Sequence, residues 1–108
     1  GKPIFEHQTV AFRLAEMATR IEVARQLTWH AAALRSAGER CLKEASMAKM
    51  MATDMAEEVC SAAIQTFGGS GYLKDFPVER FYRAARGTRI YEGTNDIQKL
   101  VIAREIAG

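Results

Sequence analysis

Apolar side chains recur at steps of three and four residues along two long stretches of the chain, as they do on one face of an amphipathic helix. The first stretch runs from about His7 to Ser36 and contains neither proline nor glycine. Glu16 and Arg20 lie on another face, at the spacing of an i,i+4 ion pair. We therefore expect one helix about 45 Å long. Its apolar face consists of Val10, Leu14, Met17, Ile21, Ala24, Thr28 and Ala31.

The second stretch, from about Glu39 to Phe67, has a face of mostly smaller side chains, which lets a partner helix approach closely. Only Ser36-Ala37-Gly38 separates the two stretches, and glycine readily adopts the left-handed backbone that ends a helix. Two long helices joined by so short a turn predict an antiparallel helical hairpin. The small face of the second helix consists of Leu42, Ala45, Ala48, Ala52, Met55, Val59 and Ala62.

Glycine and proline divide the rest of the chain. The segment Gly68–Gly71 is glycine at all but one position, which predicts a turn because each glycine costs about 1 kcal/mol inside a helix. Pro77 opens a short helix predicted from about Val78 to Ala85. The last helix is predicted from about Asn95 to Ala107, with Thr94 or Asn95 as its N-cap. The pattern as a whole predicts an all-α chain, a four-helix up-down bundle with a long antiparallel hairpin.

The amino-acid composition of the chain limits the kinds of partner that it is expected to bind. The chain has 108 residues, of which 48% are hydrophobic and 26% charged, and this fits a single globular domain. No uncharged apolar stretch reaches the ~18 residues of a membrane-spanning helix. A net charge of +2 gives no support for nucleic-acid binding. Neither a membrane nor a nucleic acid is therefore expected as a partner.

The two cysteines indicate a reducing compartment. On one straight helix Cys41 and Cys60 would lie ~28 Å apart, whereas a disulfide needs Cα atoms within ~7 Å. No second cysteine or histidine stands at metal-ligand spacing from either residue, so no metal site is expected. Free thiols fit a bacterial cytoplasm or a mitochondrial matrix. The start, Gly1-Lys2-Pro3, lacks an initiator Met and a signal segment, and we interpret it as the middle of a longer protein.

The residues that could carry chemistry lie between Ile64 and Ile102. The glycines of Gly68–Gly71 could cradle a phosphate with their backbone N–H groups. However, the Lys-Ser/Thr of a P-loop and a preceding strand are both missing, so a simple inter-helix turn is the favoured interpretation. Taken alone, the position of Glu92 in the loop before the last helix is more typical of a solvated or capping carboxylate than of a catalytic one.

Together these segments resemble the C-terminal helical domain of the acyl-CoA dehydrogenase family, flavoenzymes that desaturate acyl-CoA thioesters. The resemblance extends over residues 1–108, follows the short- and medium-chain type, and implies that the chain is one domain of a longer enzyme. It depends on four motifs in the family's order, namely Gly1-Lys2-Pro3-Ile4 with Gln8, Gln65-Thr66-Phe67-Gly68-Gly69-Ser70-Gly71-Tyr72, Pro77-Val78-Glu79-Arg80 with Arg83, and Ile90-Tyr91-Glu92-Gly93-Thr94 with Ile97-Gln98.

The resemblance implies that Glu92 is the catalytic base that removes the α-proton while a β-hydride passes to FAD. Such a base is expected in a water-poor cleft that faces the substrate. In the family, the backbone N–H of the base residue also holds the thioester oxygen, an oxyanion-hole arrangement. Gly93 would let the substrate approach the backbone, and Tyr91 would line the acyl pocket.

The resemblance also implies a set of FAD contacts, a homo-oligomer arranged as a dimer of dimers, and electron-transfer flavoprotein as the electron acceptor. One group of residues would touch the adenine and pyrophosphate half of the FAD of a neighbouring subunit. A second group would contact FAD at the start of the last helix. The first group is Gln65, Phe67, Gly68 and Gly69, with Gln8 as a further flavin-proximal position, and the second is Thr94, Asn95 and Asp96.

Two departures from the family pattern and one alternative remain. Ala84 follows Arg83 where relatives usually carry Asp, and Asp96 places an acid near the expected FAD phosphates. The alternative function is a non-catalytic helical module that contributes oligomer and FAD contacts without activity of its own.

For other residues the interpretations are structural. Trp29 and Met17 are expected in a core or interface, and most of the basic cluster is expected in salt bridges. This cluster consists of Arg80, Arg83, Arg86 and Arg89.

Overall fold

The computed structural model describes residues 1–108, and every regular element in it is helical. Four α-helices follow one another along the chain, and two short 3-10 helices accompany them. The all-α prediction with four helices is confirmed. The α-helices are α1 (Gln8–Ser36), α2 (Leu42–Phe67), α3 (Val78–Thr88) and α4 (Asn95–Ala107), and the 3-10 helices are η1 (Ile4–Glu6) and η2 (Gly68–Tyr72).

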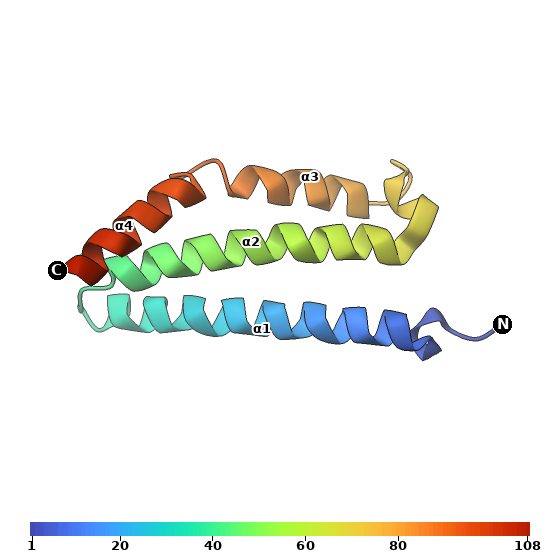
Figure 1. Cartoon of the computed structure of the whole chain (residues 1–108), viewed down its shortest axis with the longest axis horizontal. Coiled ribbons are helices and arrows are strands. Elements are labelled where there is room, and N and C mark those ends of the chain that lie inside the picture. The colour runs from blue at the N-terminus through green and yellow to red at the C-terminus, as the bar shows by residue number, and fades with distance from the viewer.

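Helix α2 lies in the centre of the molecule (Figure 1). Helix α1 packs antiparallel along one side of α2, while α3 and α4 follow one another along the other side and do not reach α1. The predicted hairpin is therefore confirmed, but the four helices do not enclose a common core. The reason is length, since α3 and α4 have 11 and 13 residues and together match the 26 residues of α2. The result is an elongated molecule of 57 × 25 × 23 Å.

The turn between α1 and α2 ends the first helix as the sequence predicts. Gly38 has a φ of 74°, and its N–H donates to Arg35 O over 3.1 Å. The N–H of Glu39 donates to Leu34 O over 3.0 Å, which completes a Schellman motif. Because Glu39 takes part in this cap, α2 starts at Leu42 rather than at the predicted residue 39.

The other helix boundaries differ little from the prediction. Helix α3 continues to Thr88 rather than to residue 85, because the glycine within its last turn is tolerated. Thr94 is the N-cap of α4, since its Oγ1 accepts the N–H of Ile97 over 3.3 Å. The predicted Glu16–Arg20 pair is wrong, because Arg20 instead forms an ion pair with Glu58 of α2.

Small side chains make the core. The buried apolar residues are Ala24, Ala31, Ala48, Val78, Ala85 and Ile102, and no large side chain is fully buried. The chain exposes 7625 Å², whereas a compact protein of this size exposes about 6,000 Å². Trp29 is 59% exposed, so it belongs to no core within this chain. Large exposed apolar groups of this kind are typical of surfaces that other protein parts cover.

Cys41 and Cys60 are free thiols, as predicted. Both are half-buried, and burial raises the pKa of the Cys60 thiol above its ordinary value. A raised thiol pKa means a smaller fraction of thiolate, the reactive form. Cys60 therefore lacks the character of a nucleophile.

The glycine-rich segment is a 3-10 helix that packs tightly against the end of α2. A Cβ added at Gly71 would lie 2.6 Å from Ile64 O and 2.9 Å from Phe67 Cβ. We expect Gly71→Ala to lower the free energy of unfolding of this segment by about 2 kcal/mol, because the clash involves backbone that cannot move aside. Native-state hydrogen exchange of residues 64–73 measures this loss.

Gly69→Ala is the matched control for that substitution, because nothing lies within 4 Å of its added Cβ. Its local stability should change by no more than about 0.5 kcal/mol. Equal exchange in the two variants would show that the close approach at Gly71 has no energetic weight.

Candidate functional site

The loop between α3 and α4, residues 89–94, carries the predicted base. Two N–H groups at its start, those of Ile90 and Tyr91, donate to Gly87 O over 2.9 and 3.3 Å. At its end, the N–H of Asn95 donates back to Arg89 O over 3.1 Å. These three bonds close the loop upon itself and fix where α4 begins.

The turn inside this loop has an unusual backbone. Glu92 has a φ of 56° and is the only non-glycine residue with a positive φ, and Gly93 follows with a φ of 82°. A left-handed backbone costs a residue with a side chain about 1–2 kcal/mol. Such strain persists where the surrounding structure enforces it, and it is concentrated at functional sites.

The same turn leaves three successive backbone donors unused. The N–H groups of Glu92, Gly93 and Thr94 have no acceptor within the chain, although their neighbours on both sides do. Unpaired N–H groups before a helix N-terminus form a site for negative charge. The turn is therefore a ready donor for an oxyanion.

The side chain of Glu92 is exposed and makes no ion pair. It lines none of the three principal clefts of the molecule. Tyr91 and Gly93, the predicted substrate contacts, are exposed beside it. The water-poor cleft expected around Glu92 is thus not formed by residues 1–108 alone, since no other element of the chain covers this side of the loop.

The three cofactor residues predicted at the start of α4 have different surroundings. Thr94 caps the helix with its hydroxyl, and the Asp96 side chain is 91% exposed beside Lys99. Asn95 is only 5% exposed. Its Nδ2 donates to Thr53 Oγ1 over 2.9 Å and to Asp54 Oδ1 over 2.8 Å.

The predicted contact between Asn95 and FAD stays a prediction, but the Asn95 side chain is directed toward α2. Both polar atoms of the amide are engaged by α2, and the backbone N–H is engaged by Arg89 O. A buried amide is most stable when its partners satisfy it completely. Asn95 therefore fastens the start of α4 to α2.

The other predicted FAD residues lie at one end of the molecule, where α1 begins and α2 ends (Figure 1). All of them are exposed, and Phe67 forms an edge-to-face pair with Phe76 at 6.2 Å between ring centroids. Helix α3 separates this end from the Glu92 loop by about 16 Å along its axis. The structure thus arranges the predicted residues in two separate groups. The group at this end consists of Gln8, Gln65, Phe67, Gly68 and Gly69.

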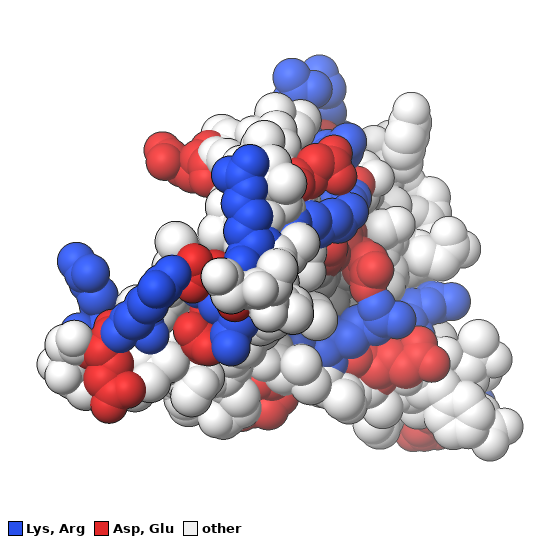
Figure 2. All heavy atoms as spheres, turned by 60° about the vertical axis from the view of Figure 1, so that its left-hand side comes forward, with Lys and Arg blue, Asp and Glu red and all other residues white.

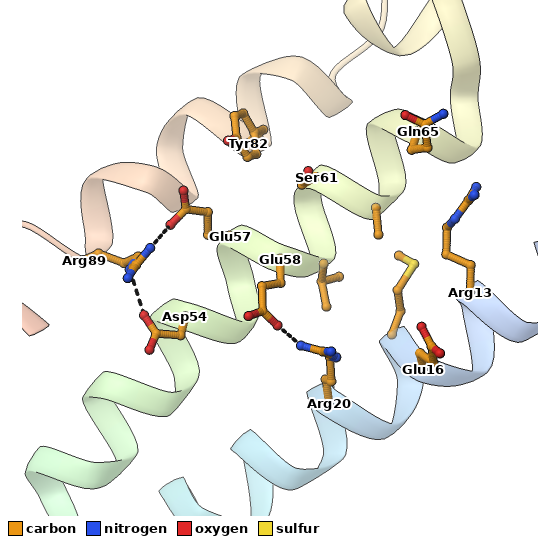
Figure 3. A pocket seen from close by; sticks show the side chains of 13 residues that line it. Arg13, Glu16, Arg20, Asp54, Glu57, Glu58, Ser61, Gln65, Tyr82 and Arg89 are labelled. Atoms are coloured by element: carbon orange, nitrogen blue, oxygen red, sulfur yellow. Dashed lines mark hydrogen bonds and ion pairs between the residues drawn. The ribbon is translucent and has the colours of Figure 1, made fainter.

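An open cleft of about 670 Å³ lies over α2, between α1 and α3 (Figure 3). Inside it the Arg89 guanidinium lies between two carboxylates of α2, with Nε 2.7 Å from Asp54 Oδ1 and Nη1 2.6 Å from Glu57 Oε2. The hydrogen bond to Glu57 is the main cause of a raised pKa for Arg89. Arg20 pairs with Glu58 in the same cleft. These two groups of ion pairs brace the end of α3 and α1 against α2.

The basic cluster of α3 is partly explained by these pairs. Arg89 and Arg86 both contact Glu57, the latter with 3.4 Å between Nε and Oε1, which confirms salt bridges for two of the four arginines. Arg80 stacks over the Phe81 ring at 5.8 Å. On the face shown in Figure 2, basic and acidic side chains are interspersed and do not gather by sign. No helix combines the length and apolar character needed to span a bilayer.

Sequence reasoning missed Lys49 entirely. From the N-terminal half of α2 its Nζ donates to Gly93 O over 2.9 Å and to Asn95 Oδ1 over 2.7 Å. The one available signal was its isolation, since Lys49 is the only charged residue between Ala45 and Thr53. A lone lysine at the edge of the small-residue face of a helix is a candidate for a specific polar contact.

Comparison with known proteins agrees with this geometry. Residues 1–107 match the family described as acyl-CoA dehydrogenase, C-terminal domain. An acyl-CoA dehydrogenase of Bacillus subtilis (strain 168) is 53% identical over the whole chain, which covers 28% of that relative. Butyryl-CoA dehydrogenase from Megasphaera elsdenii superposes with a TM-score of 0.97 at 41% identity, over 100% of this chain and 28% of that one. The FAD complex of PigA superposes with a TM-score of 0.94 at 33% identity, over 99% of this chain and 28% of that one.

The chain thus spans little more than a quarter of the length of the proteins it matches. Both the matched family and the shared helical arrangement extend over nearly every residue. The resemblance found in the motifs is confirmed, and the chain belongs to the acyl-CoA dehydrogenase family, to whose C-terminal domain it corresponds.

Proposed function

We propose that the protein containing this domain is an FAD-dependent acyl-CoA dehydrogenase in which Glu92 removes the α-proton of the substrate. The observation that carries the proposal is the strained turn at Glu92, where an exposed carboxylate stands beside three unpaired N–H groups. A base and an oxyanion donor on one turn are what the removal of a proton α to a thioester needs. The names of the Bacillus and Megasphaera relatives support the same reaction class.

In this reaction the two C–H bonds at Cα and Cβ break and a C=C bond forms. The Glu92 carboxylate takes the α-hydrogen as a proton. The β-hydrogen would leave as a hydride with its two electrons, and bound FAD would supply the acceptor for it. The thioester oxygen gathers negative charge as the α-proton leaves, and the N–H of Glu92 is free to donate to it. Gly93 carries no side chain that would obstruct this approach.

The group of predicted FAD residues at the Gly68 end of the molecule fits a flavin dinucleotide. Gly68 and Gly69 have nothing within 4 Å of the place where a Cβ would be, so a ligand can approach their backbone. Phe67 is 51% exposed beside them and offers a flat apolar face. We assign Gln8, Gln65 and these three residues to FAD contacts, and Thr94 and Asp96 to contacts at the start of α4.

The separation of the two groups supports a role for a second subunit. Residues at the Gly68 end and residues at the Glu92 loop lie on opposite ends of α3 (Figure 1). We propose that the first group contacts the FAD of a neighbouring subunit in a homo-oligomer, a dimer of dimers. Electron-transfer flavoprotein is the proposed acceptor for the electrons that leave the reduced flavin.

We expect the isolated domain to have no activity. Glu92 has no covering wall within residues 1–108, and catalytic proton transfer from carbon needs a site that excludes water. The alternative of a helical module without activity of its own thus applies to the separate domain, while the full-length protein is proposed to be the enzyme.

We expect the purified full-length protein to contain FAD and to lose its visible flavin absorption when butyryl-CoA or octanoyl-CoA is added without oxygen. Acetyl-CoA is the matched control, because it has no β-carbon and can give up no hydride. Flavin that stays oxidised with acyl-CoA substrates of every length would refute the proposed function. Rapid hydrogen peroxide formation in air would instead assign the protein to the oxidases.

A further inference from the structure

A half-buried lysine holds the loop that carries Glu92. Lys49 Nζ donates to Gly93 O and to Asn95 Oδ1, at 2.9 and 2.7 Å. Its ammonium has no carboxylate within ion-pair distance, so the two neutral oxygens are its only partners. A lysine that gives up part of its hydration for two neutral acceptors is unusual, because such residues are mostly exposed or paired with a carboxylate.

The second oxygen belongs to a side chain that is itself fixed. Asn95 is 5% exposed and is hydrogen-bonded to Thr53 and Asp54 of α2. Lys49 therefore connects a buried network on α2 to the backbone of the turn. Because all of these α2 residues lie within two helical turns, the anchor is rigid.

The side-chain contacts to the turn are all made to its carbonyl groups. Its carbonyl groups accept from Lys49 and from Gln98, whose Nε2 lies 3.2 Å from Gly93 O and 3.4 Å from Glu92 O. Its N–H groups stay free. Because the C=O of one residue and the N–H of the next lie in one peptide plane and point in opposite directions, holding Glu92 O and Gly93 O fixes the directions of the N–H groups of Gly93 and Thr94. The same contacts oppose relaxation of the strained φ of Glu92.

We propose that Lys49 is a positioning residue for the proposed reaction. It holds the Glu92–Gly93 turn so that the carboxylate and the free N–H of Glu92 face the substrate together. The inference builds on the proposed function, since it assigns the support of the same base. Lys49 acts through the backbone of Gly93 and the side chain of Asn95, which are its hydrogen-bond partners.

The test is Lys49→Met in the full-length holoenzyme, which keeps the length of the side chain and removes its donors. We expect the single-turnover rate of flavin reduction by butyryl-CoA to fall about 10- to 100-fold, because a small displacement of a catalytic group costs up to about a hundredfold. The substrate concentration at half-maximal rate should change less than about threefold, and FAD content should stay at the wild-type level. Lys49→Arg, which retains charge and donors, should recover most of the rate.

Hydrogen exchange provides a second measurement, which reports on the stability of the loop at residues 89–94 independently of catalysis. The N–H of Asn95 closes the loop on Arg89 O, and we expect its hydrogen exchange in Lys49→Met to become at least tenfold faster. Lys43→Met is the matched control, since this lysine is on the same helix and contacts only the neighbouring Glu44. It should leave the rate and the exchange unchanged.

The possible failures can be told apart. A Lys49→Met enzyme with wild-type rate and wild-type Asn95 exchange would overturn the inference while the proposed function stands. A loss of rate that merely follows a loss of bound FAD would overturn it as well. If the wild-type flavin is not reduced by any acyl-CoA, the proposed function is wrong, and the exchange of Asn95 alone decides whether Lys49 holds the turn. If Lys49→Met does not fold, Lys49→Gln, which is shorter but polar, must show the same two losses.

Discussion

Replacing Glu92 with Gln in the full-length enzyme is expected to leave FAD bound and to slow flavin reduction by butyryl-CoA about 10²- to 10⁴-fold. This is the usual contribution of a general base. Glutamine has the shape of glutamate and retains the backbone N–H of the turn, so substrate binding should survive. The amide cannot accept the α-proton at neutral pH. Anaerobic stopped-flow measurement of the flavin absorption separates the rate of reduction from the affinity for substrate.

Glu39→Gln is the matched control for this substitution. Glu39 lies in the turn between α1 and α2, away from the Glu92 loop, and the same chemical change there should leave the rate of flavin reduction unaltered. Flavin reduction by Glu92→Gln at a rate close to that of the wild type would remove Glu92 from the role of base. The family assignment would remain, because it depends on the whole chain.

Asn95→Ala is expected to destabilise the start of α4 by about 3 kcal/mol, the largest stability effect of any single substitution considered. The substitution deletes an amide that satisfies Lys49, Thr53 and Asp54 at once. Each buried polar group left without a partner costs about 1–3 kcal/mol, and more when it is charged. Native-state hydrogen exchange of the amides from 95 to 102 in the full-length enzyme measures the loss.

Lys99→Ala tests whether the effect is specific to the buried network. Lys99 lies on the same helix, is 61% exposed and contacts only Asp96, so we expect a change of no more than about 0.5 kcal/mol. Exchange in Asn95→Ala that matches Lys99→Ala would show that the network around Asn95 contributes little. Asp54 and Lys49 would then have to be hydrated in the native protein.

The helices and their ends were largely predictable because the forces that form them act between near neighbours. The Gly38 cap and the Thr94 cap each depend on bonds within a few residues. Apolar periodicity identified the two long helices, and glycine, proline and cap residues identified the two short ones, all close to their observed bounds. Glu92 and Gly93 were also found from the sequence, through the motif that carries them. The strained backbone at Glu92 was not predicted, since glutamate rarely adopts a positive φ and nothing nearby in the sequence requires it.

The remaining features depend on which helices pack against one another, and contacts between residues far apart in the sequence decide this. The chain alone determined an all-α architecture with a long hairpin, because periodicity and caps are local. Only the tertiary structure decided that α3 and α4 share one side of α2, that Arg20 pairs with Glu58, and that Asn95 turns inward. The contact between Lys49 and Gly93 joins residues 44 positions apart. A bond of that kind leaves no periodic trace in the sequence, because its partners become neighbours only when the small side chains of α2 let the other helices pack against it.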